Sequence, residues 1–248
     1  MKFSDVAEIV GEIPYTSPEK GKIFYDFVLA NKPEQCVELG FAHGTSSCYI
    51  AAALHELGRG RLTAVDLDSS VDRNPNIEAL LKATGLEAHV TVVREKAGYN
   101  WFLKKKIEEQ TRDGLCQPLY DYCFIDGAKN WTIDGFAFFL VDKLLKEGAW
   151  LQFDDYSWTY EHHEARTGKN VSDGIDHGAL SDDELREPHI KAIFHDLVMQ
   201  HPHYANFRVA DDRLAWAQKT QSGPRRLRID TEVSLRFKLV KALKKILR

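Results

Sequence analysis

Short apolar segments alternate with amphipathic segments along most of this chain. Five apolar runs of strand length predict β-strands at residues 36–39, 62–66, 90–93, 122–126 and 149–153. Apolar residues at helical spacing predict helices before and between these runs, at residues 18–30, 46–56, 76–84, 100–111 and 136–146. This alternation predicts an α/β fold with a doubly wound, mostly parallel, Rossmann-like sheet that has helices on both faces.

The C-terminal third departs from this alternation. Two segments with a strand pattern, residues 207–210 and 213–219, flank Asp211 and Asp212, which predicts an antiparallel hairpin. The preceding residues, 161–187, are polar and show neither a helix period nor a strand period. They follow a predicted strand directly, so we expect a long loop that acts as a lid over a ligand site. With no internal repeat, residues 1–223 are expected to form one domain.

Charge is distributed unevenly. The whole chain carries a formal net charge of −4, but residues 224–248 contain nine basic and two acidic side chains, giving +7, which leaves −11 for the preceding part. Phe237, Val240, Leu243 and Leu247 recur at helical spacing, so residues 224–248 are predicted to form a basic amphipathic helix. The pattern leaves open whether this helix packs on its own domain, across a homodimer, or on an anionic membrane or partner.

The composition is that of a soluble globular protein, and three further features lead us to expect a cytoplasmic location. No apolar run approaches the roughly 20 residues that a membrane-spanning helix needs. The first residues lack the apolar core of a signal peptide. The four cysteines form no Cys-x-x-Cys pair, so we expect free thiols in a reducing compartment.

Acidic residues follow two of the predicted strands. Asp126 ends the strand at 122–126, and Asp154 and Asp155 come directly after the strand at 149–153. Parallel strands joined by a helix end at the same edge of a sheet, so these carboxylates should converge, with Lys129 close by. Single acidic residues at strand ends are common, but three neighbouring carboxylates repel one another unless a cation or protons neutralise them. Oxygen-only ligands favour Mg²⁺ or another hard divalent cation.

A glycine turn follows the first predicted strand. Gly40 and Gly44 suit a tight turn where a ligand approaches the backbone, and Asp66, at the end of the second strand, could accept hydrogen bonds from both hydroxyls of a ribose. His43 lies in the same turn and could contact the ligand. Because position 42 is alanine, the dinucleotide fingerprint G-x-G-x-x-G is not matched. The turn therefore indicates a ligand that contains a nucleoside but no pyrophosphate.

These motifs together resemble the class I S-adenosylmethionine-dependent methyltransferases, and more narrowly the metal-dependent O-methyltransferases of the catechol and caffeoyl-CoA type. The resemblance rests on Glu38-Leu39-Gly40, Gly44-Thr45-Ser46, Asp66, Asp126, Lys129 and Asp154-Asp155. Residues 16–21 are similar to the segment that helps cover the cofactor in the caffeoyl-CoA type. Catechol-type enzymes usually carry Asp-Asn where this chain has two aspartates, a departure that the related bacterial branch of sugar O-methyltransferases tolerates.

The resemblance implies Mg²⁺-dependent transfer of a methyl group from S-adenosylmethionine to a hydroxyl of a small molecule or sugar, with no nucleic-acid partner. It implies that Asp126, Asp154 and Asp155 bind the metal and that Lys129 is the general base, with Asp126 also taking part in catalysis. The cofactor contacts that it implies are Ser17, Glu38, Gly40, His43, Gly44, Thr45, Ser46, Asp66 and Asp126. Thr45 or Ser46 is also expected to cap the helix that follows the glycine turn.

Two other functions remain open at the level of sequence. One is a metal-independent methyltransferase, in which Asp126 and Asp154 act as bases on an amine or carboxylate acceptor. The other is a module that binds S-adenosylmethionine without catalysis, which would need neither the three carboxylates nor Lys129. In the enzyme, Trp131 and Trp158 follow the metal motifs closely enough to form walls of the acceptor pocket, which residues 161–187 would cover.

Overall fold

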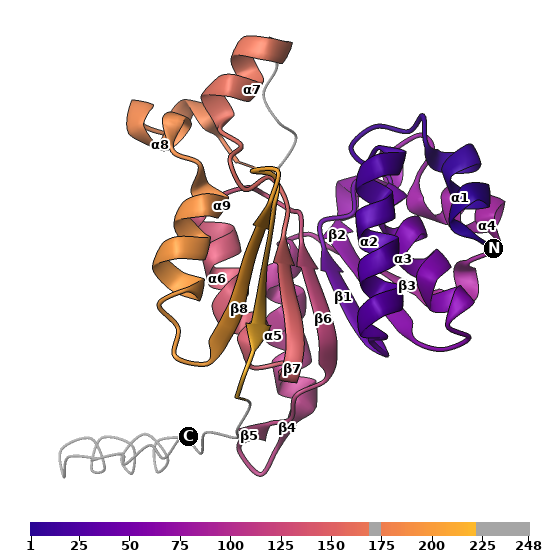
Figure 1. Ribbon diagram of the computed structural model, residues 1–248. Helices are drawn as coiled ribbons and strands as arrows, with labels where there is room; N and C mark the ends of the chain where they lie inside the picture. The colour runs from indigo at the N-terminus through magenta and orange to yellow at the C-terminus, as the bar shows by residue number, and fades with distance from the viewer. Residues whose placement is uncertain (169–174, 222–248) are drawn as a thin grey trace, which may run out of the picture.

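The computed structural model describes residues 1–168 and 175–221 (Figure 1). A seven-stranded sheet with the strand order β3-β2-β1-β6-β7-β9-β8 forms its centre. The strands of this sheet are β1 (Gln35–Leu39), β2 (Arg61–Leu67), β3 (Val90–Glu95), β6 (Tyr120–Ile125), β7 (Leu145–Phe153), β8 (Tyr204–Ala210) and β9 (Leu214–Lys219). A separate two-stranded hairpin, which the sequence pattern did not predict, pairs β4 (Thr111–Arg112) with β5 (Leu115–Cys116).

The sheet is parallel from β3 to β7, and β9 then runs antiparallel to both β7 and β8. All five strands predicted in the first part of the chain are therefore confirmed, as is the C-terminal hairpin. At its turn Asp211 and Asp212 have φ angles of 52° and 53°, the left-handed conformation that suits a two-residue hairpin turn. The strand order reverses between β1 and β6, and ligands of such sheets bind at the carboxyl ends of the strands at this point.

Helices cover both faces of the sheet, as expected (Figure 1). One face packs against α1 (Phe3–Val10), α2 (Pro18–Asn31), α3 (Thr45–Glu56) and α4 (Ile77–Thr84). The other packs against α5 (Tyr99–Gln110), α6 (Trp131–Asp142) and α9 (His189–Ala192), which continues into the π-helical turn η4 (Ile193–Val198). Two short 3-10 turns, η1 (Asp68–Asp72) and η2 (Glu87–His89), flank α4. The sheet therefore has a separate apolar core on each face.

The helix predicted at residues 136–146 lies earlier in the chain, as α6. Its start is fixed by Asn130, whose side-chain oxygen accepts hydrogen bonds from the backbone nitrogens of Thr132 and Ile133. Its end is fixed by the long strand β7, which takes up Leu145 and Lys146. The apolar pattern of residues 136–146 therefore spans the end of a helix and the start of a strand.

The expectation that residues 161–187 lack helices is wrong for the part that the structure describes. It contains α7 (Tyr160–Thr167), η3 (His177–Ala179) and α8 (Asp182–Arg186). Thr159 caps α7, and Ser181 forms a capping box with Glu184 at the start of α8. Capping by polar side chains, rather than an amphipathic pattern, supports these short helices. The lid function of this segment stays a prediction.

Two further predictions concern the C-terminal helix and membrane-spanning segments, and only the described residues bear on them. The basic amphipathic helix predicted for residues 224–248 lies outside them. Among the described helices, none combines the length and the apolar character that a membrane-spanning segment requires.

Candidate functional site

Gly40 places the loop after β1 directly against the turn after β6. Its φ angle is 92°, and a Cβ atom added there would lie 2.5 Å from Cα of Gly127 and 2.6 Å from the carbonyl oxygen of Asp126. No side chain fits between two backbones at that distance, so glycine is required both by conformation and by space. The predicted cofactor loop and the predicted metal motif are therefore neighbours at the point where the strand order reverses.

Asp66 holds the glycine loop in shape. Its Oδ2 atom accepts hydrogen bonds from the backbone nitrogens of Phe41, at 2.8 Å, and Ala42, at 2.7 Å, while Oδ1 accepts one from Leu67 N at 2.6 Å. Ala42 has a left-handed φ of 47°, a conformation that these contacts help to maintain. A carboxylate oxygen can accept more than one hydrogen bond, so the ribose contact stays a prediction compatible with this geometry.

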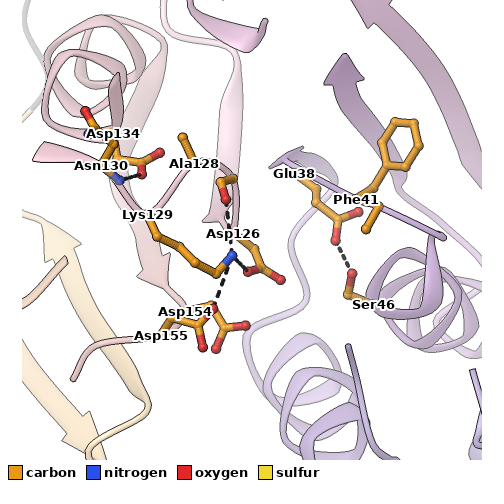
Figure 2. A network of polar contacts seen from close by, with 12 residues as sticks. Glu38, Phe41, Ser46, Asp126, Ala128, Lys129, Asn130, Asp134, Asp154 and Asp155 are labelled. Carbon is orange, nitrogen blue, oxygen red and sulfur yellow. Dashed lines mark hydrogen bonds and ion pairs between the residues drawn. The ribbon is translucent and has the colours of Figure 1, made fainter. Parts of the chain in front are cut away.

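Glu38 lies at the centre of a buried polar group under the loop. It accepts a hydrogen bond from the hydroxyl of Ser46 at 2.5 Å (Figure 2). It accepts a second one from the hydroxyl of Ser47. Burial raises the pKa of the Glu38 carboxyl to about 7, although the two serine hydroxyls act in the opposite direction. The expectation that Thr45 or Ser46 caps α3 is wrong, because Gly44 occupies the cap position and the Ser46 hydroxyl donates to Glu38 instead.

The other predicted cofactor residues lie at or just before the starts of helices α2 and α3. Thr45 is the first residue of α3 and is buried. His43 places Nδ1 2.6 Å from the carbonyl oxygen of Pro75, and Ser17 caps α2 by accepting a hydrogen bond from Lys20 N. These hydrogen bonds explain the local structure, and contact of these residues with a cofactor stays a prediction.

The three aspartates of the predicted metal site converge. Asp126 directly follows β6, Asp154 and Asp155 directly follow β7, and one oxygen from each lies within 4.8 Å of the others. The amine of Lys129 lies between them, 3.4 Å from Oδ1 of Asp126 and 3.2 Å from Oδ2 of Asp155 (Figure 2). The convergence expected from parallel strand ends is therefore present.

Lys20 also reaches this cluster, which the sequence did not indicate at first sight. Its Nζ forms an ion pair with Oδ2 of Asp154, and both side chains are buried. Lys20 precedes Phe24 and Val28 by four and eight positions on α2, so it lies on the buried face of that helix. A lysine in register with a buried apolar face was the signal that could have revealed it, because buried charges are paired.

Burial and neighbouring charges act against each other in the cluster. Burial raises the pKa values of Asp126 and Asp154. Burial also acts to raise the pKa of Asp155, but Lys129 and Lys20 outweigh it and leave that pKa lowered. For Lys129, burial favours the neutral amine, yet Asp155, Asp126 and Asp154 together raise its pKa. Lys129 is therefore an ammonium ion in this arrangement.

The residues present fit a divalent cation. The Oδ1 atom of Asp154 is buried and accepts no hydrogen bond from any residue that the structure describes. Buried carboxylate oxygens normally have a partner, so an unpartnered one beside two further carboxylates is suited to a metal ion. All the candidate ligand atoms are oxygens, the donors that hard cations such as Mg²⁺ prefer.

A second buried network fixes the loop that carries Lys129. The backbone nitrogen of Ala128 donates to the hydroxyl of Tyr99 at 3.1 Å, and the Ala128 carbonyl accepts from the Tyr160 hydroxyl at 3.0 Å. The Tyr99 hydroxyl in turn donates to Asp134, which also accepts from Asn130 N at 2.9 Å. Sequence reasoning missed Asp134, whose only signal is an acidic residue among the buried positions of α6. The loop from residue 127 to 130 is thus held on both sides.

The two tryptophans expected at the acceptor pocket differ in their surroundings. Trp158 packs edge-on against Tyr160, with ring centroids 4.8 Å apart, and lies 5.6 Å from His163. Trp131, at the start of α6, is partly exposed, and its backbone nitrogen donates to Nδ1 of His189. Contact of either ring with an acceptor stays a prediction.

Comparison with known proteins assigns the fold. Residues 37–156 match the model of a family described as a methyltransferase domain. No curated protein matches the chain significantly. The match spans the glycine loop, Asp66, the metal motif and Lys129. Residues 37–156 are therefore similar to a methyltransferase domain, which agrees with the class of enzyme that the sequence motifs resemble.

Solved structures of O-methyltransferases share this fold. TomG of Streptomyces achromogenes, involved in tomaymycin synthesis and solved with S-adenosylmethionine, is 18% identical with a TM-score of 0.59, over 88% of this chain and 89% of its own. An O-methyltransferase from Bacillus cereus, solved with S-adenosylhomocysteine, is 18% identical with a TM-score of 0.60, over 88% and 91%. A putative caffeoyl-CoA O-methyltransferase from Staphylococcus aureus is 19% identical with a TM-score of 0.57, over 88% and 90%.

Proposed function

We propose that this protein transfers a methyl group from S-adenosylmethionine to a hydroxyl of a small molecule or sugar, with Mg²⁺ or another divalent cation at Asp126, Asp154 and Asp155. The observation that carries the proposal is the convergence of these three carboxylates and Lys129 beside the glycine loop. A module that only binds the cofactor would need no such cluster. The carboxylates would hold the cation, and the lysine would receive a proton.

The glycine loop is the proposed cofactor site. Gly40 has no side chain where the strand order reverses, and the Asp66 carboxylate lies against the loop, where its oxygens accept hydrogen bonds from backbone nitrogens. The proposal is supported by the proteins of the same fold from Streptomyces achromogenes and Bacillus cereus, which were solved with S-adenosylmethionine and S-adenosylhomocysteine. Asp66 would bind the ribose hydroxyls of this cofactor.

In the proposed mechanism Lys129 removes the proton of the acceptor hydroxyl. A cation bound at the carboxylates would lower the pKa of that hydroxyl and orient it toward the methyl group. Lys129 must be neutral to act, whereas in this arrangement the carboxylates hold it as an ammonium ion. The positive charges of a bound cation and of the cofactor's sulfonium would favour loss of its proton. The hydrogen bonds of Tyr99 and Tyr160 to the backbone of Ala128 would keep the Lys129 amine beside the reacting oxygen.

A screen with radiolabelled S-adenosylmethionine tests this proposal. Catechols, glycosides and nucleotide sugars would be offered as acceptors with Mg²⁺, with EDTA, and with EDTA followed by excess Mg²⁺. We expect transfer to a hydroxyl that EDTA abolishes and that added Mg²⁺ restores. Full activity in EDTA would favour the metal-independent methyltransferase. Binding of the cofactor without transfer to any acceptor would favour the non-catalytic module.

A further inference from the structure

The two carboxylate oxygens of Asp154 have different surroundings. Oδ2 is paired with the ammonium of Lys20, which reaches it from α2 across 134 positions of sequence. Oδ1 is buried and accepts no hydrogen bond from the described residues. Asp154 is therefore already paired with one cation of the protein through Oδ2, while its other oxygen has no hydrogen-bond partner among the described residues.

This pairing reduces the negative charge that draws a divalent cation to the site. Three carboxylates, from Asp126, Asp154 and Asp155, are in contact with two ammonium groups, from Lys20 and Lys129. With every group counted in its ionised form, the formal charge of these five side chains is −1, compared with −3 for the carboxylates alone. The affinity of oxygen-only sites for divalent cations depends on the number of charged ligands. An ammonium that shares a carboxylate with the metal also repels it directly.

We propose that Lys20 is a built-in cation that weakens divalent-cation binding to the free protein, so that tight binding requires the negative charge of an acceptor oxygen. This inference rests on the proposed function, because it assumes that the three aspartates bind a metal. It assigns Lys20 a positioning and regulatory role at the site rather than a step in the chemistry. Acceptors that present an anionic or readily ionised oxygen would then be favoured.

If Lys20 had a purely structural role, its removal would change the affinity for a divalent cation in the opposite direction. Groups that orient a metal ligand from outside typically improve metal affinity 10–100-fold. If Lys20 only oriented Asp154, its removal would weaken metal binding. Asp154 has other constraints, because its backbone nitrogen donates to the carbonyl oxygen of Ile125 at 3.0 Å. Loss of Lys20 would also leave a buried carboxylate unpaired, which increases the gain from binding a metal.

Isothermal titration calorimetry of the full chain with Mg²⁺ and with Mn²⁺, without acceptor, tests whether removal of Lys20 strengthens or weakens binding of the ion. We expect Lys20→Met to bind either ion at least ~10-fold more tightly than the wild type. Lys20→Arg keeps the charge and should bind as the wild type does. Lys22→Met is the matched control, because Lys22 lies on the same helix but is exposed and pairs with Asp26 at 2.6 Å.

A second readout covers the case in which Lys20→Met folds less well. Thermal melting with and without Mg²⁺ should show a larger stabilisation by the ion in Lys20→Met than in the wild type, because the stabilisation by a bound ligand increases as its dissociation constant falls. Lys20→Gln provides a polar alternative for the same comparison. Binding of S-adenosylmethionine by each variant confirms that the fold is intact.

The outcomes separate this inference from the proposed function. If Lys20→Met binds the ions equally or more weakly while the wild type needs Mg²⁺ for activity, the role of Lys20 is wrong and the proposed function stands. If neither protein binds Mg²⁺ or Mn²⁺ although both bind S-adenosylmethionine, the metal part of the proposed function fails together with the inference. Tighter binding by Lys20→Met but not by Lys20→Arg supports it.

Discussion

The amine of Lys129 lies 3.2 Å from Oδ2 of Asp155, and both residues have a left-handed backbone, with φ angles of 57° and 54°. Residues other than glycine rarely adopt this backbone conformation, and those that do cluster at functional sites. The strain is sustained here by surrounding contacts, among them the hydrogen bonds that Tyr99 and Tyr160 make to the Ala128 backbone. The two charged groups are therefore held in place before any ligand binds.

Replacement of Lys129 by alanine tests its role as general base. Lys129→Ala should lower kcat by ~10²–10⁴-fold with an alcohol acceptor, the usual range for a positioned acid–base group. The loss should be smaller for acceptors whose hydroxyl is already acidic, because they need less help in losing the proton. Steady-state kinetics in Mg²⁺ measures both, with the exposed Lys82→Ala as the control. A wild-type kcat on an alcohol would remove Lys129 from the mechanism.

Parts of the site could be predicted from sequence because strand topology alone determines them. Asp126, Asp154 and Asp155 end neighbouring parallel strands, so their convergence follows from the alternation of strands and helices. Lys20 and Asp134 could not be placed in this way. Each lies on a helix, and only the packing of that helix on the sheet determines which charged residue faces the site.

The element boundaries show the same limit. The start of α6 depends on the side chain of Asn130 rather than on apolar spacing, and its predicted range ran into β7. The short helices after residue 159 have no amphipathic pattern, so they appeared as a loop. The predicted strands were reliable because both faces of a parallel sheet are covered, which produces compact apolar runs.

Replacement of Asp66 tests the cofactor site. Asp66→Ala should weaken binding of S-adenosylmethionine by roughly 1–3 kcal/mol, the scale of lost charge-assisted hydrogen bonds. The loss has two sources, the proposed ribose contact and the support that Asp66 gives to the backbone nitrogens of Phe41 and Ala42. Isothermal titration calorimetry measures it, with the nearby Asp68→Asn as the control. Unchanged affinity in Asp66→Ala would contradict the assignment.

Removal of the Tyr99 hydroxyl tests the clamp on the Lys129 loop. Tyr99→Phe deletes the donor to Asp134 and the acceptor of Ala128 N, both buried. We expect a loss of about 2–3 kcal/mol in the free energy of unfolding, the range for buried hydrogen bonds to a charged group. Denaturation by urea measures it, and Tyr15→Phe, at an exposed tyrosine, should change little. Equal stability of Tyr99→Phe and the wild type would show that the network does not support the loop.

The buried carboxyl of Glu38 should make stability depend on pH. Burial raises its pKa to about 7 from an ordinary value of 4.5, so between these pH values the folded protein keeps a proton that the unfolded chain has lost. The contribution of Glu38 to stability is therefore largest below pH 4.5, falls as the pH rises toward 7, and is fully lost above it. Glu38→Gln has no charge to bury and retains an oxygen for Ser46 and Ser47. Measured by urea denaturation, the stability of Glu38→Gln relative to the wild type should increase by up to about 3 kcal/mol between pH 5 and pH 8. The exposed Glu87→Gln should instead follow the wild type at both pH values. Parallel pH profiles for Glu38→Gln and the wild type would mean that Glu38 is ionised at no cost inside the fold.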